Sequence, residues 1–298
     1  MSDKRIIAVH AHPDDETLNN GITFPKYAAE GAHITLVTSN LGEEGEIVVP
    51  DLELLSVHHA DQLGGYRTGE LALACDALGV TEHHYLGGMG RYRDSGMMGE
   101  SSNDNPRCFW QADLDEAAGY LVPIIRKNRP QVLLTYNEFG GYGHPDHIQA
   151  HRVAVRGREL AADASYEPEL GDAWMIAKVY FSQLPRSELA KRIEALREIG
   201  QENAFDVTDA ADAEIAADDE LITTIIEAGQ FVADRKLAMQ AHRSQLRFDS
   251  PQFKLLGVIG PGALARDFYQ LAIGEVGPVD RATGKEVDLF AVIDLGSA

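Results

Sequence analysis

Short apolar runs alternate with helical patterns over the first half of the chain. The expected strands are residues 5–11, 32–40, 82–88 and 131–138. The expected helices lie within residues 15–31, 54–80 and 113–130, and several of these stretches end at Gly or Pro. Strand and helix in alternation predict an α/β fold, with a Rossmann-like, mainly parallel sheet and flanking helices.

The chain after residue 171 has a less regular pattern. It contains a strand pattern over residues 175–184 and helical patterns over 187–200 and 231–246. We therefore expect a Rossmann-like domain over residues 1–170 and a smaller α+β subdomain over residues 171–298.

The turn after the first apolar run carries His12, Asp14, Asp15 and Glu16. In a dinucleotide-binding fold this turn carries glycines, which let main-chain N–H groups approach a pyrophosphate, whereas carboxylates repel phosphate. Imidazole and carboxylate together suit zinc or a similar divalent metal. The alternative is structural: Asp14 or Asp15 caps the following helix, and the helix dipole favours Glu16.

A second polar cluster, His144, Asp146 and His147, follows the apolar run that ends near residue 136. Parallel strands bring their carboxyl ends to one edge of a sheet, so we expect the two clusters to meet. A hydrolytic zinc site needs three protein ligands and an open position, which His12, Asp15 and one histidine of the second cluster supply. Two interpretations of Asp146 remain: it orients a histidine, or it lies exposed on the following helix.

The chain carries a formal net charge of −21, which repels phosphate backbones and anionic lipid headgroups. We therefore expect neither nucleic acid nor a membrane as a partner. No apolar run approaches the length of a membrane-spanning helix, and the first residues lead directly into a strand. These features predict a cytoplasmic protein, and they leave its oligomeric state, including a homo-oligomer, open.

The motifs "AHPDDE" and "GHPDH" resemble those of the zinc-dependent deacetylases of the LmbE/PIG-L type, which cleave N-acetyl groups from glucosamine conjugates. Further motifs, "LGEEGE", "GGYRTGEL" and "GRYRDSG", resemble the members of this family that act on an N-acetylglucosaminyl-inositol in mycothiol biosynthesis. The resemblance covers most of residues 5–150. It is weaker afterwards, where "AMQAHRSQ" is the clearest match.

The resemblance implies a function for each matching residue. The family's zinc ligands fall on His12, Asp15 and His147, and its general base falls on Asp14. His144 matches the position that assists the transition state, and Tyr142 matches a mobile residue that contacts the reacting carbonyl. One zinc ion per subunit is implied, with Fe²⁺ as an alternative in air-free cells.

The implied chemistry is consistent with the residue types. Zinc polarises an amide carbonyl and lowers the pKa of water, and Asp14 takes the proton. The leaving amine receives its proton from either Asp14 or protonated His144. The metal site would lie in residues 1–170, and the C-terminal subdomain would contribute to the substrate pocket.

Three residues are candidates for substrate binding. Arg67 and Asp94 lie in glycine-rich stretches, and a guanidinium and a carboxylate can bind vicinal sugar hydroxyls. Glu46 is a weaker candidate of the same kind. The pair His83-His84 is expected to have no catalytic function, and His242 is either packed in a late helix or placed over the pocket.

Two other functions compete with deacetylation of a glucosaminyl-inositol. A mycothiol S-conjugate amidase would share the metal site and the mechanism. A non-catalytic module that binds zinc or sugar is of a different class, and it would leave Asp14 without a role.

Overall fold

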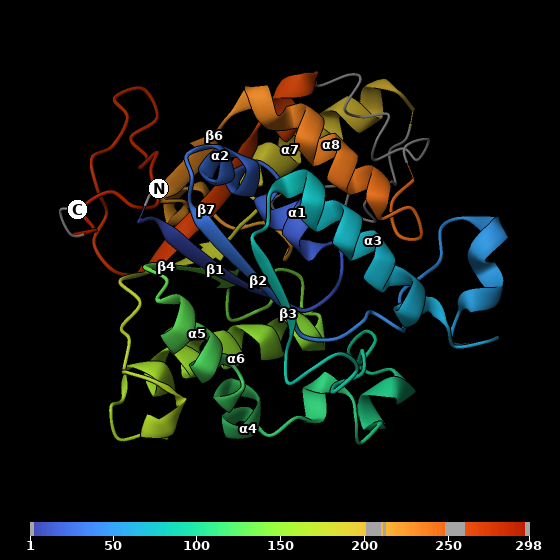
Figure 1. The fold of residues 1–298 in the computed structure, drawn as a ribbon. Helices are drawn as coiled ribbons and strands as arrows, with labels where there is room; N and C mark the ends of the chain where they lie inside the picture. The colour runs from blue at the N-terminus through green and yellow to red at the C-terminus, as the bar shows by residue number, and fades with distance from the viewer. Residues whose placement is uncertain (1–2, 201–209, 211–212, 248–259, 296–298) are drawn as a thin grey trace.

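Seven strands form one sheet at the centre of the computed structural model, which describes residues 3–200, 210, 213–247 and 260–295 (Figure 1). Their order across the sheet is β3-β2-β1-β4-β5-β7-β6. The strands are β1 Arg5–His10, β2 His33–Thr38, β3 Glu82–Tyr85, β4 Val132–Tyr136, β5 Lys178–Ser182, β6 Thr224–Glu227 and β7 Arg266–Ile273.

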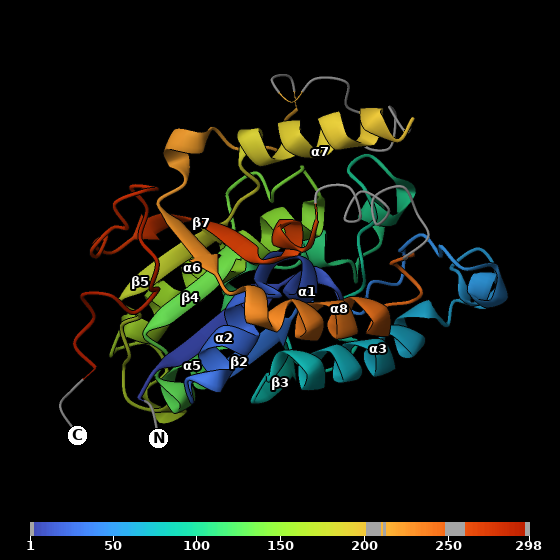
Figure 2. The same cartoon turned by 90° about the horizontal axis from the view of Figure 1, so that it is seen from above.

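Helices cover both faces of this sheet. They are α1 Asp15–Asn20, α2 Thr23–Ala29, α3 Leu63–Leu78, α4 Leu114–Gly119, α5 Leu121–Asn128, α6 Pro145–Ala162, α7 Arg186–Glu198 and α8 Val232–Ala241. The helices α4, α5 and α6 lie on one face, and α1, α2, α3 and α8 lie on the other (Figures 1 and 2). None of the helices in the described residues combines the length and the apolar character needed to cross a bilayer.

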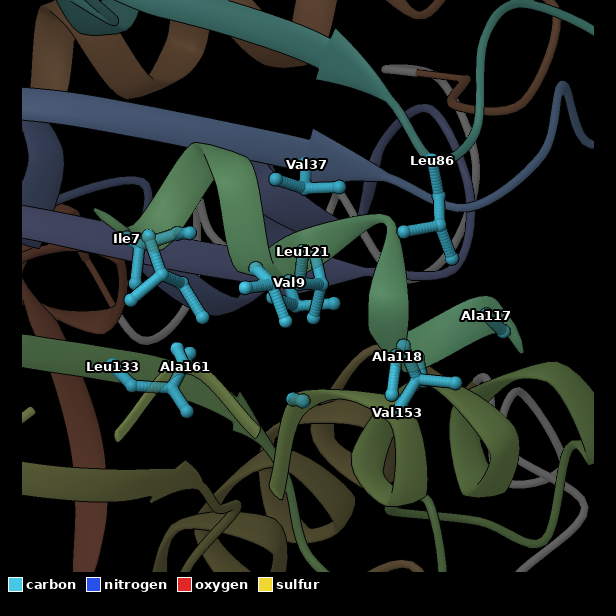
Figure 3. Close-up of a cluster of buried hydrophobic side chains, with 14 of the residues drawn as sticks. Ile7, Val9, Val37, Leu86, Ala117, Ala118, Leu121, Leu133, Val153 and Ala161 are labelled. Carbon is cyan, nitrogen blue, oxygen red and sulfur yellow. The ribbon is translucent and has the colours of Figure 1, made fainter. Parts of the chain in front are cut away.

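The apolar run of β1 is explained by burial on both faces. Ile7 and Val9 pack against α4, α5 and α6 (Figure 3), and Ile6 and Ala8 pack in the cluster on the opposite face. A strand buried on both sides has a continuous apolar sequence rather than an alternating one. The same reason makes β2 and β4 recognisable from the sequence.

The predicted α/β fold is confirmed. β3, β2, β1, β4 and β5 run parallel to their neighbours, as expected from the alternation of strands and helices. β1 lies between β2 and β4, so the strand order reverses beside β1 and opens a crevice at the carboxyl ends of β1 and β4. The boundary at residue 170 remains a prediction, and the sheet continues across it.

The strands β6 and β7 were not predicted, and they pair antiparallel at the edge of the sheet. β7 was difficult to recognise because it buries a carboxylate, Asp267. The Asp267 Oδ2 atom accepts hydrogen bonds from the main-chain nitrogens of Ile22 and Thr23, and Oδ1 accepts one from Arg235. These partners come from α8 and the start of α2, so they are invisible in the local sequence.

Candidate metal centre

The loops after β1 and β4 meet at one edge of the sheet. The two strands are paired neighbours, with Ile7 opposite Leu133, and both end at this edge. Pro145 begins α6 without leaving an N–H group unpaired, and the preceding His144 occupies the N-cap position. His147 in the first turn of α6 is thereby brought to the loop that carries His12.

Three donor groups from these loops converge. The His12 Nδ1 atom lies 3.3 Å from His147 Nε2 and 3.7 Å from Asp15 Oδ2. The His147 Nε2 atom lies 3.5 Å from Asp15 Oδ1. Donors of a tetrahedral divalent ion with bonds near 2.1 Å lie about 3.4 Å apart. The three side chains that the sequence predicted as ligands therefore lie close together, and their binding of one metal ion remains a prediction.

The hydrogen bonds of the two histidines orient their lone pairs toward this point. His147 Nδ1 lies 3.1 Å from the carbonyl oxygen of Gly140, so Nδ1 carries the proton and Nε2 the lone pair. His12 Nε2 lies 3.3 Å from Asp146 Oδ2 and 3.5 Å from Asp94 Oδ1, so it is the protonated atom of that ring. Both tautomers suit metal ligands.

His144 also lies close enough to His12 and His147 to belong to a donor group. Its Nδ1 atom, however, accepts a hydrogen bond of 3.1 Å from the main-chain nitrogen of Asp146. The proton of neutral His144 is therefore on Nε2, and the ring presents a donor rather than a lone pair. The division between a ligand His147 and an assisting His144 remains a prediction.

The electrostatics of the centre favour a cation. Burial alone lowers the pKa of His12, but the carboxylates of Asp94, Asp146 and Asp15 outweigh it and raise that pKa well above its ordinary value. Burial opposes ionisation of Asp15, yet His147 and His12 hold its pKa below the usual range. Burial lowers the pKa of His147 to about 4, so this imidazole is neutral at pH 7.

Asp14 has an unusual main-chain conformation beside this centre. It occupies the N-cap position of α1 with φ 134° and ψ −26°, and its side chain makes no capping hydrogen bond. The capping interpretation is therefore wrong for Asp14. The carboxylate instead lies 3.2 Å from Arg67 Nη2, and burial raises its pKa to about 6.

His144 and Tyr142 both pack near His147 but differ in exposure. His144 is buried, with its ring centroid 4.7 Å from that of His12, and burial lowers its pKa to about 3. Tyr142 is 42% exposed, and its ring packs edge-on against His147 at 5.0 Å. The tyrosine is thus placed at the rim of the centre, in contact with solvent.

The candidates for sugar binding are placed differently from one another. Arg67 is buried, and its guanidinium donates to the carbonyl oxygens of Gly42 and Pro13. Asp94 is buried beside His12 and accepts a hydrogen bond of 2.9 Å from the main chain of Gly96. Glu46 is exposed. Arg67 and Asp94 therefore have partners within the protein, and the binding of sugar hydroxyls by these three residues remains a prediction.

The sequence left the role of Asp146 open and gave no indication that Tyr136 contacts a predicted ligand. The Asp146 carboxylate is fully buried, and besides His12 it accepts hydrogen bonds from Asn40 Nδ2 at 2.8 Å and from the main chain of Ser95 at 3.0 Å. Of the two interpretations of Asp146, the orientation of a histidine is the one that this contact supports. Tyr136 stacks on His147, with ring centroids 4.2 Å apart, but at the end of an apolar strand it looks like a core residue.

A cavity of about 460 Å³ opens beside the centre. Its lining residues include Asp15, Tyr142 and His147, and also Met239 of α8 and Phe268 of β7. The region after residue 171 therefore contributes wall residues to the cavity next to the metal centre. Arg67, Asp94 and Glu46 are not among its lining residues.

Several known proteins are similar to this chain in sequence. The family model described as PIG-L, GlcNAc-PI de-N-acetylase, matches residues 7–157. The chain is 53% identical over 289 residues to the 1D-myo-inositol 2-acetamido-2-deoxy-alpha-D-glucopyranoside deacetylase of Geodermatophilus obscurus, covering 97% of each chain. It is 52% identical to the protein of the same name from Acidothermus cellulolyticus, covering 99% of this chain and 97% of the relative.

A solved structure extends the comparison to the fold. The N,N'-diacetylchitobiose deacetylase of Pyrococcus horikoshii superimposes with a TM-score of 0.61 at 17% identity, over 91% of this chain and 84% of that one. At this identity the similarity concerns the fold alone.

Proposed function

The chain belongs to the PIG-L, GlcNAc-PI de-N-acetylase family, and on that premise we propose that it hydrolyses the acetamide of 1D-myo-inositol 2-acetamido-2-deoxy-alpha-D-glucopyranoside. The products are acetate and the free amine of the glucosaminyl-inositol, a step of mycothiol biosynthesis. The observation that carries the proposal is the convergence of His12, Asp15 and His147 next to Asp14, whose carboxylate does not cap its helix.

We assign His12 Nδ1, Asp15 and His147 Nε2 as the ligands of one zinc ion, with Fe²⁺ as the alternative in air-free cells. The fit rests on the spacing of the donors and on the tautomers that their hydrogen bonds select. When bound, zinc would polarise the amide carbonyl and lower the pKa of water toward neutrality. Asp94 and Asp146 hold the proton on His12 Nε2 and thereby orient the ring.

The other side chains handle protons and the developing charge. Asp14 accepts a proton from the attacking water, since its carboxylate is not used as a helix cap. His144 donates a hydrogen bond from Nε2 to the carbonyl oxygen as negative charge builds there, and the Tyr142 hydroxyl approaches the same oxygen from the rim. Asp14 then passes its proton to the departing amine as the C–N bond breaks, so the acid-base residue returns to its starting state.

The two alternatives differ from this proposal in distinct ways. A mycothiol S-conjugate amidase would use the same centre, but the relatives at about half identity are named for the deacetylation. A non-catalytic binding module would have no use for the Asp14 carboxylate or for the strained main chain that carries it. The cytoplasmic location, the lack of nucleic-acid and membrane partners and the oligomeric state stay predictions.

The test is an acetate-release assay on three substrates. The protein loaded with zinc is offered N-acetylglucosaminyl-inositol, N-acetylglucosamine and a mycothiol S-conjugate, and the highest kcat/KM is expected for the first. Asp14→Asn should keep the metal and lose about 10²–10⁴-fold in kcat, whereas Asp15→Ala should lose metal and activity together. Preference for the S-conjugate would favour the amidase, and no turnover of any substrate would favour the binding module.

A further inference from the structure

His242 lies in the C-terminal half of the chain, at the end of α8, and is not one of the proposed metal ligands. We propose that it is a positioning residue for the deacetylation: by holding the Glu16 carboxylate, it fixes the main chain of Asp14 and so aims the Asp14 side chain. This inference rests on the proposed function, because it concerns the residue assigned there as the base.

Two hydrogen bonds connect His242 to Asp14. The His242 Nε2 atom lies 2.7 Å from Glu16 Oε1, and both side chains are almost completely buried. The other oxygen of the same carboxylate, Glu16 Oε2, accepts a hydrogen bond of 3.0 Å from the main-chain nitrogen of Asp14. One carboxylate therefore links a late helix end to the residue before α1.

The main chain of Asp14 needs such support. Its φ of 134° lies in a region that residues with a Cβ rarely adopt, and such strain persists only where the surroundings impose it. The adjacent carbonyl of Pro13 is held by Arg67 of α3, and the Asp14 nitrogen is held by Glu16. Besides the Asp14 nitrogen, the buried Glu16 carboxylate accepts hydrogen bonds only from His242 and the Thr17 hydroxyl among the contacts in the described residues. Without His242 it would lose the one partner that can carry a positive charge, and its position would be less fixed.

The turn that carries His242 is itself anchored. Ser244 donates to both oxygens of Glu70 in α3, from its main chain at 2.8 Å and from its hydroxyl at 2.6 Å. The carbonyl of Ser244 accepts a hydrogen bond of 2.9 Å from Val48. In Figure 2, α1, α8 and α3 lie next to one another on the same face of the sheet, and α8 contacts both of the others. Contacts with α3 thus fix the position of His242. His242 in turn holds Glu16, which binds the main chain of Asp14 before α1.

This arrangement also gives a role to the motif "AMQAHRSQ", the clearest resemblance in the second half of the sequence. Within it, His242 and Ser244 reach inward to Glu16 and Glu70, whereas Arg243 points to the surface and pairs with exposed Asp51 at 2.6 Å. Arg243 is therefore a matched control in the same turn.

The experiment compares variants of the zinc-loaded full chain. His242→Phe keeps a ring of similar size and removes the donor, and His242→Gln places an amide nitrogen where Nε2 lies. Arg243→Ala removes the contacts of Arg243 with Asp51 and Tyr66 and leaves the bonds of Glu16 and Glu70 in place. A displacement of a catalytic group by about 1 Å can cost about 100-fold in rate. We expect His242→Phe to lower kcat by about 10–100-fold with unchanged KM and zinc content, His242→Gln to recover most of that loss, and Arg243→Ala to match the wild type.

The same substitution in the Asp14→Asn background separates positioning from a general loss of structure. If His242 acts through Asp14, His242→Phe causes no further loss once the base is absent. An unchanged kcat in His242→Phe, or an equal loss in both backgrounds, would overturn the proposal. If His242→Phe does not fold, His242→Asn replaces it, and its shorter amide should give a kcat below that of His242→Gln.

A crystal structure of His242→Phe supplies a readout that does not depend on activity. The φ of Asp14 should leave the region near 134° when Glu16 loses its contact with His242. If the wild type fails to release acetate, the proposed function fails, yet the conformation of Asp14 in the variant still decides the positioning. An Asp14 main chain that is identical in the variant and the wild type refutes it.

Discussion

Replacement of Asp14 by glycine and by alanine should separate main-chain strain from side-chain chemistry. Both variants lose the carboxylate and its contact with Arg67, so they differ only in the presence of a Cβ at φ 134° and ψ −26°. A residue with a Cβ pays about 1–3 kcal/mol for such a conformation, and glycine does not. Glycine loses about 0.5–1 kcal/mol more in conformational entropy than alanine on folding.

The difference between these terms favours the glycine variant by about 1 kcal/mol. In ordinary helical positions the order is reversed, because alanine is the more stable by about 1 kcal/mol. The sign of the difference is therefore the diagnostic quantity. For a chain of this size, about 1 kcal/mol corresponds to a rise in Tm of about 2–4 °C for Asp14→Gly over Asp14→Ala.

Thermal unfolding of the two metal-free variants, followed by circular dichroism, measures this difference. Both should also lose about 10²–10⁴-fold in kcat, because neither retains the base. The substitution Gly65→Ala provides the ordinary case, because Gly65 lies in the first turn of α3 and a Cβ there meets nothing within 4 Å; here alanine should be the more stable residue. If Asp14→Ala is at least as stable as Asp14→Gly, the main chain at Asp14 is not strained, and the reasoning about its support fails.

Three further predictions concern the metal, the pH dependence and the edge of the sheet. Asp146→Asn should weaken metal affinity about 10–100-fold while the fold is kept, measured by competition with a chelator, because Asp146 lies 3.3 Å from His12 Nε2; unchanged affinity would contradict the orienting role. Burial lowers the pKa of His83 from 6.5 to about 4, so the folded state binds fewer protons there than the unfolded state between these values, and stability should fall as the pH drops from about 6.5 to about 4. The loss is at most about 3 kcal/mol. Urea unfolding at about pH 7 and about pH 4.5 should show a smaller fall in the free energy of unfolding for His83→Leu than for the wild type. An equal fall would assign the effect to other groups. Glu286→Ala should cost about 3–5 kcal/mol, because it removes the acidic partner of buried Lys178, which lies at 2.6 Å. Glu188→Ala removes a surface pair with Lys191 and should cost less than about 1 kcal/mol, and similar shifts in Tm would refute the distinction.

The central strands and the polar residues at their ends could be predicted from local sequence patterns. β1, β2 and β4 are buried on both faces, and this burial requires continuous apolar runs that can be read without any knowledge of their partners. The residues that follow β1 and β4 could be predicted to meet because parallel strands share an edge. The donor set His12, Asp15 and His147 was therefore accessible from local patterns, one topological rule and the family resemblance that singled out His147.

The groups that support that centre could not be predicted, because they come together only through packing. Asp267 in β7 and Glu16 at the start of α1 are buried carboxylates whose partners lie far away in the chain, Arg235 for the first and His242 for the second. Periodicity reports which positions are buried, but it does not report what a buried polar group binds. Asp146 could be assigned as an orienting residue only when packing brought it to His12, because the energy of a buried carboxylate depends on donors that the fold collects from separate elements.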